Sequence, residues 1–154
     1  MERRITEEQA TKAILDWLEA NDWKIICFDF PQSGTGVSLH PNEELRTTKN
    51  KGAFIPDIVA IKNRTVIFFE NKDRFVLDDF FKVKNLRNKN DFSNSIERLL
   101  AEFEYTEILY GVGLVHSVFA EQMSSLHIDK IDFCVFYHGD KTIKIHFDPK
   151  EIFK

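Results

Sequence analysis

Residues 56–72, PDIVAIKNRTVIFFENK, decide how this chain folds. An apolar run follows the dipeptide PD, and a second apolar run over residues 66–69 leads directly into ENK at residues 70–72. Charged side chains seldom flank a fully apolar strand unless they are solvated, paired or bound to a metal ion. We therefore expect the charged ends of the two runs to lie at the margin of a β-sheet, where ligand sites form.

The two apolar runs predict two β-strands, over residues 57–61 and 65–72, joined by a short polar turn. A connection this short implies an antiparallel hairpin, because a parallel crossover needs about a dozen residues or more. The hairpin would bring Asp57 and Glu70 to neighbouring strand ends. Side chains two residues apart on a strand project from the same face, so Lys72 should accompany Glu70.

The rest of the chain predicts helices and strands on both sides of this hairpin. Thr6 fits the N-cap of an amphipathic helix, and Gln9 completes a capping box. A long functional loop or an irregular hairpin, and not a linker, is expected over residues 31–55. Residues 75–90 are ambiguous, and we interpret them as a short helix followed by a basic loop. The other expected elements are strands over residues 23–30, 108–115, 131–137 and 142–147, and helices over residues 93–104 and 118–125.

This order of elements describes an α/β fold, a mixed β-sheet flanked by helices. The 154 residues, 43% of them apolar, are most simply one domain over residues 1–154. No apolar run approaches the roughly 20 residues that span a bilayer, so we expect no membrane partner and a cytoplasmic location. Cys27 and Cys134 lie in apolar strand-like runs, which fits buried thiols in a reducing compartment.

The formal net charge of −4 excludes a polycation that coats nucleic acid indiscriminately. Basic residues nevertheless gather in two acid-free segments, residues 46–51 and 82–90, on either side of the hairpin. Two such segments around one candidate site indicate a partner that carries phosphate groups. Solvated loop charges are the alternative interpretation. The candidates for phosphate contacts are Arg74, Lys82, Lys84 and Arg87.

Pro56-Asp57 followed by Glu70-Asn71-Lys72 resembles the signature of the PD-(D/E)XK nuclease superfamily, which includes restriction endonucleases, Holliday junction resolvases and many repair and defence nucleases. The resemblance implies a restriction-endonuclease-like fold in which the two motifs lie on neighbouring strands. It covers residues 6–72. The middle position of the second motif departs from the superfamily, where an apolar or small residue is frequent, so the Asn71 side chain must be solvated or bonded.

Hydrolysis of a phosphodiester needs a cation that neutralises the phosphate and generates hydroxide near neutral pH, and Mg²⁺ held by oxygen ligands does both. The resemblance implies that Asp57 and Glu70 bind the metal ion. Asn71 would add its backbone carbonyl while its side chain points away. Lys72 would orient or activate the attacking water and stabilise the transition-state charge. Mn²⁺ would serve in place of Mg²⁺.

The superfamily often adds a carboxylate from the first helix, and two neighbouring acids are candidates for it. Glu8 is the preferred candidate and Glu7 the second, because helical spacing alone does not decide between them. Either acid would also be explained as a first-turn residue that complements the helix dipole.

These features predict a Mg²⁺-dependent DNA endonuclease that works as a homodimer, with one active site for each strand. A restriction-type endonuclease is favoured over a Holliday junction resolvase-like or repair nuclease, because the acidic net charge disfavours a broad basic junction-binding face. The alternative from another class is a non-catalytic DNA-binding subunit that kept the nuclease fold. The complete set of Asp57, Glu70 and Lys72 argues against that alternative.

Overall fold

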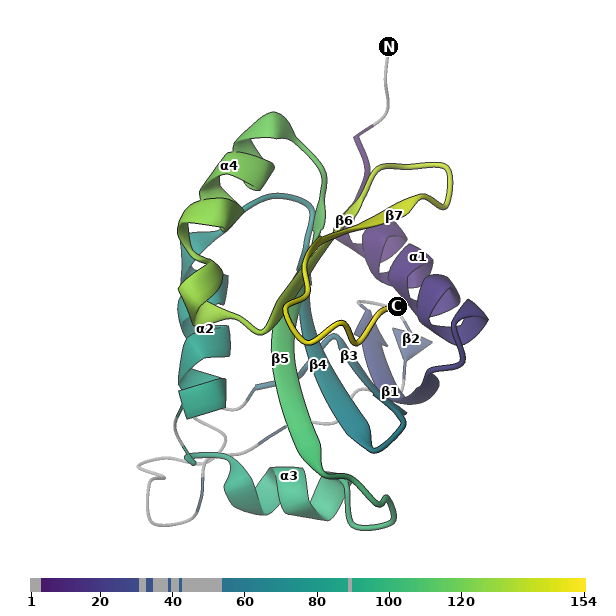
Figure 1. Cartoon of the computed structure of the whole chain (residues 1–154), viewed down its shortest axis with the longest axis vertical. Coiled ribbons are helices and arrows are strands. Elements are labelled where there is room, and N and C mark those ends of the chain that lie inside the picture. Colours follow the sequence, from purple (N-terminus) through teal and green to yellow (C-terminus); the bar gives the residue numbers. More distant parts are fainter. Residues whose placement is uncertain (1–3, 31–32, 35–38, 40–41, 43–53, 89) are drawn as a thin grey trace.

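A mixed β-sheet forms the centre of the protein in the computed structural model, which describes residues 4–30, 33–34, 39, 42, 54–88 and 90–154 (Figure 1). The strands lie in the order β2-β1-β3-β4-β5-β6-β7. Their bounds are β1 Lys24–Phe30, β2 Ser33–Gly34, β3 Ile58–Lys62, β4 Thr65–Lys72, β5 Glu107–Val115, β6 Phe133–Tyr137 and β7 Ile143–Phe147. The helices are α1 Glu7–Ala20, α2 Leu77–Asn88, α3 Ser93–Leu99, α4 Val118–Leu126 and the 3₁₀ helix η2 Ile128–Lys130.

The sheet changes from antiparallel to parallel at its middle strand, β4. On one side, β4 pairs antiparallel with β3, which pairs antiparallel with β1. On the other side, β4 pairs parallel with β5, and β5 pairs parallel with β6. Each parallel pair is joined by a helical crossover, as parallel connections require. The expected α/β fold with a mixed sheet flanked by helices is confirmed.

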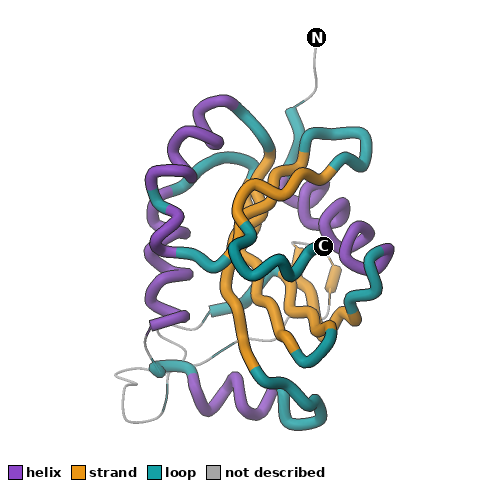
Figure 2. Tube along the Cα trace, viewed as in Figure 1, coloured by secondary structure: helices purple, strands orange, loops and turns teal. Residues whose placement is uncertain are grey.

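Helices cover both faces of the sheet, with α1 on one side and α2 and α4 on the other (Figures 1 and 2). The core beneath α1 contains Ile14 and Phe69, whereas the core beneath α2 contains Phe80 and Phe68. Successive side chains of β4 therefore enter opposite cores, as the alternation of a strand dictates. This alternation decides which side of the sheet each polar residue at the end of β4 can reach.

The predicted hairpin is confirmed as β3 and β4. Ile58 pairs with Phe69, and Lys62 pairs with Thr65 at the closed end. The two turn residues, Asn63 and Arg64, have φ angles of 50° and 68°. Left-handed conformation at both central residues is typical of the two-residue turn that matches the twist of a hairpin. The tight turn fixes the register, and Asp57, just before Ile58, therefore lies beside the end of β4.

The first helix begins as the sequence predicts. The Thr6 hydroxyl accepts a hydrogen bond from the Gln9 backbone N–H at 3.1 Å, and the Gln9 side chain accepts one from the Thr6 N–H at 2.9 Å. Cys27 and Cys134 are both buried. The second half of the expected loop, with Arg46, Lys49 and Lys51, lies outside the described residues.

The interpretation of residues 75–90 as a short helix and a basic loop is wrong. Residues 82–88 of the basic segment belong to α2, a helix of 12 residues. Phe80, Val83 and Leu86 recur at helical spacing and are buried against the sheet, so tertiary packing stabilises a helix whose other positions are mostly polar. Within the described chain, no helix is long and apolar enough to cross a bilayer.

Two glycines of β5, Gly111 and Gly113, allow close packing on the α1 side. A Cβ atom on Gly111 would overlap the ring and the carbonyl oxygen of Phe133, its partner in β6. A Cβ atom on Gly113 would overlap the end of the Ile14 side chain and lie 2.6 Å from Oδ1 of Asn71. The first clash involves backbone, which moves only if the pairing of β5 with β6 is distorted.

We expect Gly111→Ala to lower the free energy of unfolding by about 3 kcal/mol or more, because overpacking a rigid site is costly. Gly113→Ala should cost less, about 1 to 2 kcal/mol, because it displaces side-chain ends. Urea unfolding followed by tryptophan fluorescence measures both. Equal stability of the Gly111→Ala variant and the unmodified protein would contradict the packing described here.

Candidate functional site

The candidate site lies where β3 begins and β4 ends. Asp57 directly precedes β3, and its backbone N–H donates to the carbonyl of Phe69, the residue that pairs with Ile58, at 3.1 Å. Its side chain accepts a hydrogen bond at Oδ2 from the Asn71 backbone N–H at 2.7 Å. The hairpin thus brings Asp57 to Glu70 and fixes the aspartate carboxylate against the end of β4.

Glu70 and Lys72 lie on the face of β4 that is turned toward α2, the face to which Phe68 also contributes. Glu70 is only 7% exposed, and its Oε2 atom has no hydrogen-bond partner in the described part of the chain. A buried carboxylate oxygen without a donor is unfavourable, because it loses its hydration and gains nothing in return. The site therefore holds an unsatisfied negative group.

The Asn71 side chain points to the opposite face of the sheet, away from the candidate site, as expected. Its Nδ2 donates to Oγ1 of Thr11 on α1 at 3.2 Å, and the residue is fully buried. Gly113 lies next to it in β5. Because Gly113 has no side chain, the amide of Asn71 fits between β5 and α1. This hydrogen bond satisfies Nδ2 of the buried amide, whereas Oδ1 of Asn71 has no hydrogen-bond partner among the described residues.

Asp57 and Glu70 lie close together, and burial raises the pKa of both carboxyl groups. Burial raises the pKa of Asp57 to about 7, although the hydrogen bond from the Asn71 N–H works in the other direction. Burial, together with the charges of Asp57 and Asp79, raises the pKa of Glu70 to about 8. The protein supplies too little positive charge here to keep both carboxylates ionised at neutral pH without further partners.

Lys72 and Lys82 are the described cations whose charges act on Glu70, and α1 shares in holding Lys72. Its Nζ lies 3.4 Å from Oε1 of Glu7. Partial burial alone would lower the pKa of Lys72, but the charges of Asp79 and Glu7 outweigh it and raise the pKa. The lysine is therefore a charged ammonium group held among several carboxylates.

The structure brings Glu7 to the site and places Glu8 elsewhere. Glu7 is the ion-pair partner of Lys72, and its charge also contributes to the raised pKa of Asp57, after the larger effect of burial. Glu8 lines a cavity on the flank of α1 together with Lys12 and Phe28. The geometry therefore favours the second candidate, Glu7, over the preferred Glu8.

Asp79 belongs to the same cluster, and the sequence analysis missed it. It lies in the first turn of α2, is 4% exposed, and has one ion pair, with Nζ of Lys82 at 3.8 Å. A signal was present in the sequence. Asp79, Val83 and Leu86 follow the spacing of one helix face, which places the aspartate on the buried side.

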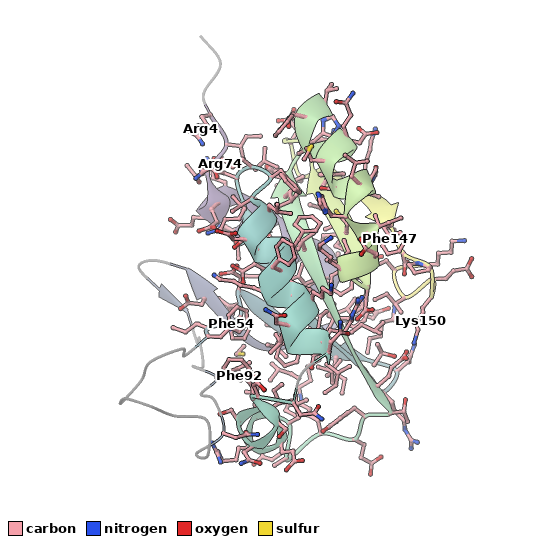
Figure 3. The ribbon with its side chains drawn as sticks, turned by 90° about the vertical axis from the view of Figure 1, so that its left-hand side faces the viewer. Arg4, Phe54, Arg74, Phe92, Phe147 and Lys150 are labelled. Carbon is pink, nitrogen blue, oxygen red and sulfur yellow. The ribbon has the colours of Figure 1, made fainter. Side chains whose placement is uncertain are left out.

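The residues predicted to contact phosphate groups lie at different distances from the candidate site. Arg74 is exposed close to the site and pairs with Asp73 at 2.8 Å, as does Arg4 at 2.7 Å, so two guanidinium groups lie together at the margin (Figure 3). Arg4 was not among the sequence candidates. Lys82 lies one turn along α2 from Asp79, and Lys84 is half-buried further along the helix.

Arg87 lies away from the candidate site and contacts other parts of the protein. Its Nη1 lies 3.3 Å from Oδ1 of Asp132, and its Nη2 donates to the Asp129 carbonyl at 2.7 Å. Asp132 also accepts a hydrogen bond from the Tyr110 N–H at 2.9 Å. Arg87 therefore links the end of α2 to β5 and to the segment before β6. Along the helix axis it lies about 12 Å from Asp79.

The residues present fit a small divalent cation with oxygen ligands. Asp57 and Glu70 converge from adjacent strands, and Glu70 keeps an oxygen without a donor. Among the residues that the structure describes, no group of three or more His, Cys, Asp or Glu side chains could hold a metal ion. The side chains would thus supply two direct ligands, which is how Mg²⁺ is commonly held, with water in its other positions.

No protein-family model, no curated protein and no solved structure matches this chain.

Replacing Glu70 by Gln tests the electrostatics of the metal-free site. The carboxyl pKa is raised on folding from 4.5 to about 8, so the folded protein prefers the protonated acid. The free energy of unfolding should fall as the pH rises between these values and stay low above them. In EDTA we expect Glu70→Gln to be more stable than the unmodified protein by roughly a few kcal/mol above about pH 8, and to lose this advantage toward about pH 5.

Urea unfolding across this pH range measures the difference. Glu97→Gln, at an exposed position of α3, is the matched control and should leave the pH dependence unchanged. A Glu70→Gln variant that is less stable than the unmodified protein at every pH would show that the carboxylate is well compensated.

Proposed function

We propose that this protein is a Mg²⁺-dependent DNA endonuclease of the PD-(D/E)XK superfamily, with a restriction-endonuclease-like fold. The observation that carries the proposal is that Asp57, held by the Asn71 N–H, lies close enough for its charge to act on Glu70 at the end of β4, with Lys72 two residues further along the same face of that strand. The neighbouring position of the two motif strands is what the resemblance to the superfamily implies. A mixed sheet with helices on both faces also supports it.

Each residue of the site has a role in phosphodiester hydrolysis. Asp57 and Glu70 would bind Mg²⁺, with the Asn71 backbone carbonyl as a further oxygen ligand. A bound Mg²⁺ would polarise the phosphate and make a water molecule more acidic. Lys72 would donate hydrogen bonds to the attacking water or to the phosphate oxygens, where negative charge develops. The Asn71 N–H holds the Asp57 carboxylate in place for this work.

DNA is the proposed substrate because cationic side chains lie beside the acidic site. Arg4 and Arg74 meet at Asp73, directly after β4, and Lys82 is close by on α2. Such side chains contact phosphate groups without reading the base sequence. Lys84 remains a proposed contact further along α2, and the pairing of Arg87 with Asp132 favours a structural role for that residue.

The proposed enzyme acts as a homodimer, because two antiparallel strands are most simply cut by two symmetric sites. Its proposed setting is the cytoplasm, where a buried thiol such as Cys134 stays reduced. Restriction-type cleavage is the proposed subclass. Preferential cutting of branched DNA would instead point to a junction resolvase, and mapping the cut ends on linear DNA separates the two.

Cleavage of a substrate panel tests the activity. The purified protein should cut plasmid or linear DNA with Mg²⁺ or Mn²⁺ and leave it intact in EDTA. Asp57→Ala should abolish cleavage, and Lys72→Ala should slow it by about 100-fold or more, because each removes a group that stabilises the transition state. DNA binding, measured by fluorescence anisotropy, should largely survive in both variants.

The proposal fails if plasmid, linear, single-stranded and branched DNA all stay intact with either cation and the protein binds neither cation. Binding of DNA without cleavage would favour the non-catalytic subunit that kept the nuclease fold.

A matched pair of variants tests the carboxylate on α1. We expect Glu7→Gln to reduce the cleavage rate by roughly 10-fold, because it releases the ammonium group of Lys72 from its position. Glu8→Gln removes the same charge one residue further along the helix and should leave the rate unchanged. Single-turnover rates at saturating Mg²⁺ make the comparison. The opposite order of effects would restore Glu8 as the functional acid.

A further inference from the structure

Asp79 is a buried acid that the hairpin chemistry does not require. It is 4% exposed, and its Oδ2 atom, like Oε2 of Glu70, has no hydrogen-bond partner in the part of the chain that the structure describes. Burial is the main cause of its raised pKa, against the opposing charges of Lys72 and Lys82. Its own charge acts in turn on Glu70 and on Lys72. The two unsatisfied carboxylates therefore belong to one electrostatic cluster.

Ordinary structural roles do not explain a buried aspartate here. An acid in the first turn of a helix favours the helix dipole, but Asp78 fills that role from an exposed position. The contact with Lys82 is 3.8 Å long and involves a lysine side chain that is 54% exposed, so it is a weak ion pair. Neither role gives the buried Oδ2 a partner.

The acids of the cluster outnumber its bases. The carboxylates are those of Glu7, Asp57, Glu70 and Asp79, and the ammonium groups are those of Lys72 and Lys82. Among these described residues, four carboxylates face two ammonium groups, which gives a net charge of −2 when all of them are ionised. A divalent cation would supply the missing charge.

We propose that Asp79 is a further carboxylate of the cation site, and that it acts on the water molecules of a bound Mg²⁺ instead of binding the ion directly. This inference rests on the proposed metal site of Asp57 and Glu70. Indirect action follows because no three acidic side chains of the described residues could hold a metal together. Mg²⁺ keeps several water molecules in protein sites, and a buried carboxylate oxygen without a donor is a suitable acceptor for them.

Metal affinity is the quantity to measure, because it needs no substrate. Mn²⁺ binding to the full chain is followed by isothermal titration calorimetry for the unmodified protein, Asp79→Asn and Asp78→Asn. We expect Asp79→Asn to weaken Mn²⁺ binding by about 10-fold or more, the usual effect of losing a group around the direct ligands. Asp78→Asn removes the same charge from the adjacent exposed position and should change the affinity by less than about twofold.

Thermal unfolding in EDTA separates this role from a structural one. If Asp79 serves the cation, Asp79→Asn should unfold at the same temperature or higher, because it removes an unsatisfied buried acid. If Asp79 serves the fold, the variant should unfold at a lower temperature and bind Mn²⁺ as tightly as the unmodified protein, which overturns the inference. Asp79→Ala is the second variant, and it should show the same loss of affinity.

The outcomes distinguish this inference from the proposed function. If the unmodified protein binds Mn²⁺ and Asp79→Asn binds it equally well, only the role of Asp79 is overturned. If the unmodified protein binds neither Mn²⁺ nor Mg²⁺, the metal site of Asp57 and Glu70 fails, and the role of Asp79 fails with it.

Discussion

The antiparallel pairing of β3 with β4 is the constraint on which the rest of the site depends. It places the carboxylates of Asp57 and Glu70 against each other in a buried position, where both are costly to ionise. Folding energy from two hydrophobic cores offsets this repulsion. Two buried acids with raised pKa values lower the stability of the fold, but they would serve to bind a cation. Such perturbed pKa values are typical of functional sites.

The strand β4 serves the fold and the site through its two faces. Toward α1 it presents Phe69 and then Asn71, whose amide bonds to Thr11 in a space left by Gly113. Toward α2 it presents Phe68, Glu70 and Lys72. The polar contact with α1 anchors the end of the strand on one face, while on the other face the ion pair with Glu7 holds Lys72.

The sequence predicted the parts of the site that depend on neighbours along the chain. Strand alternation, a short turn and motif spacing were enough to place Asp57, Glu70 and Lys72, because a two-residue turn fixes the register of a hairpin. The choice between Glu7 and Glu8 was beyond such reasoning. Adjacent helix positions point in directions about 100° apart, and only the packing of α1 on the sheet decides which one faces Lys72.

Long-range contacts account for the remaining differences. The pairing of Arg87 with Asp132 joins residues 45 positions apart, and the sequence around either one gives no sign of the other. The length of α2 could not be predicted from the sequence either. Its buried stripe is narrow and most of its surface is polar, so its contacts with the sheet are what stabilise the helix. Asp79 shares that stripe, so an accurate assignment of the helix would also have placed the aspartate beside Glu70.

The proposed metal ligands Asp57 and Glu70, together with Lys72 and Asp79, come from one continuous segment, the hairpin and the first turn of α2, while Glu7 comes from a distant part of the chain. Contacts between nearby residues form early in folding, whereas β5 and β6 join the sheet only after much longer loops close. We therefore expect Asp57 and Glu70 to meet before the sheet that supports them is complete. While the hairpin forms, repulsion between the carboxylates of Asp57 and Glu70 would oppose its closure. Cations in the surrounding solution would reduce this repulsion.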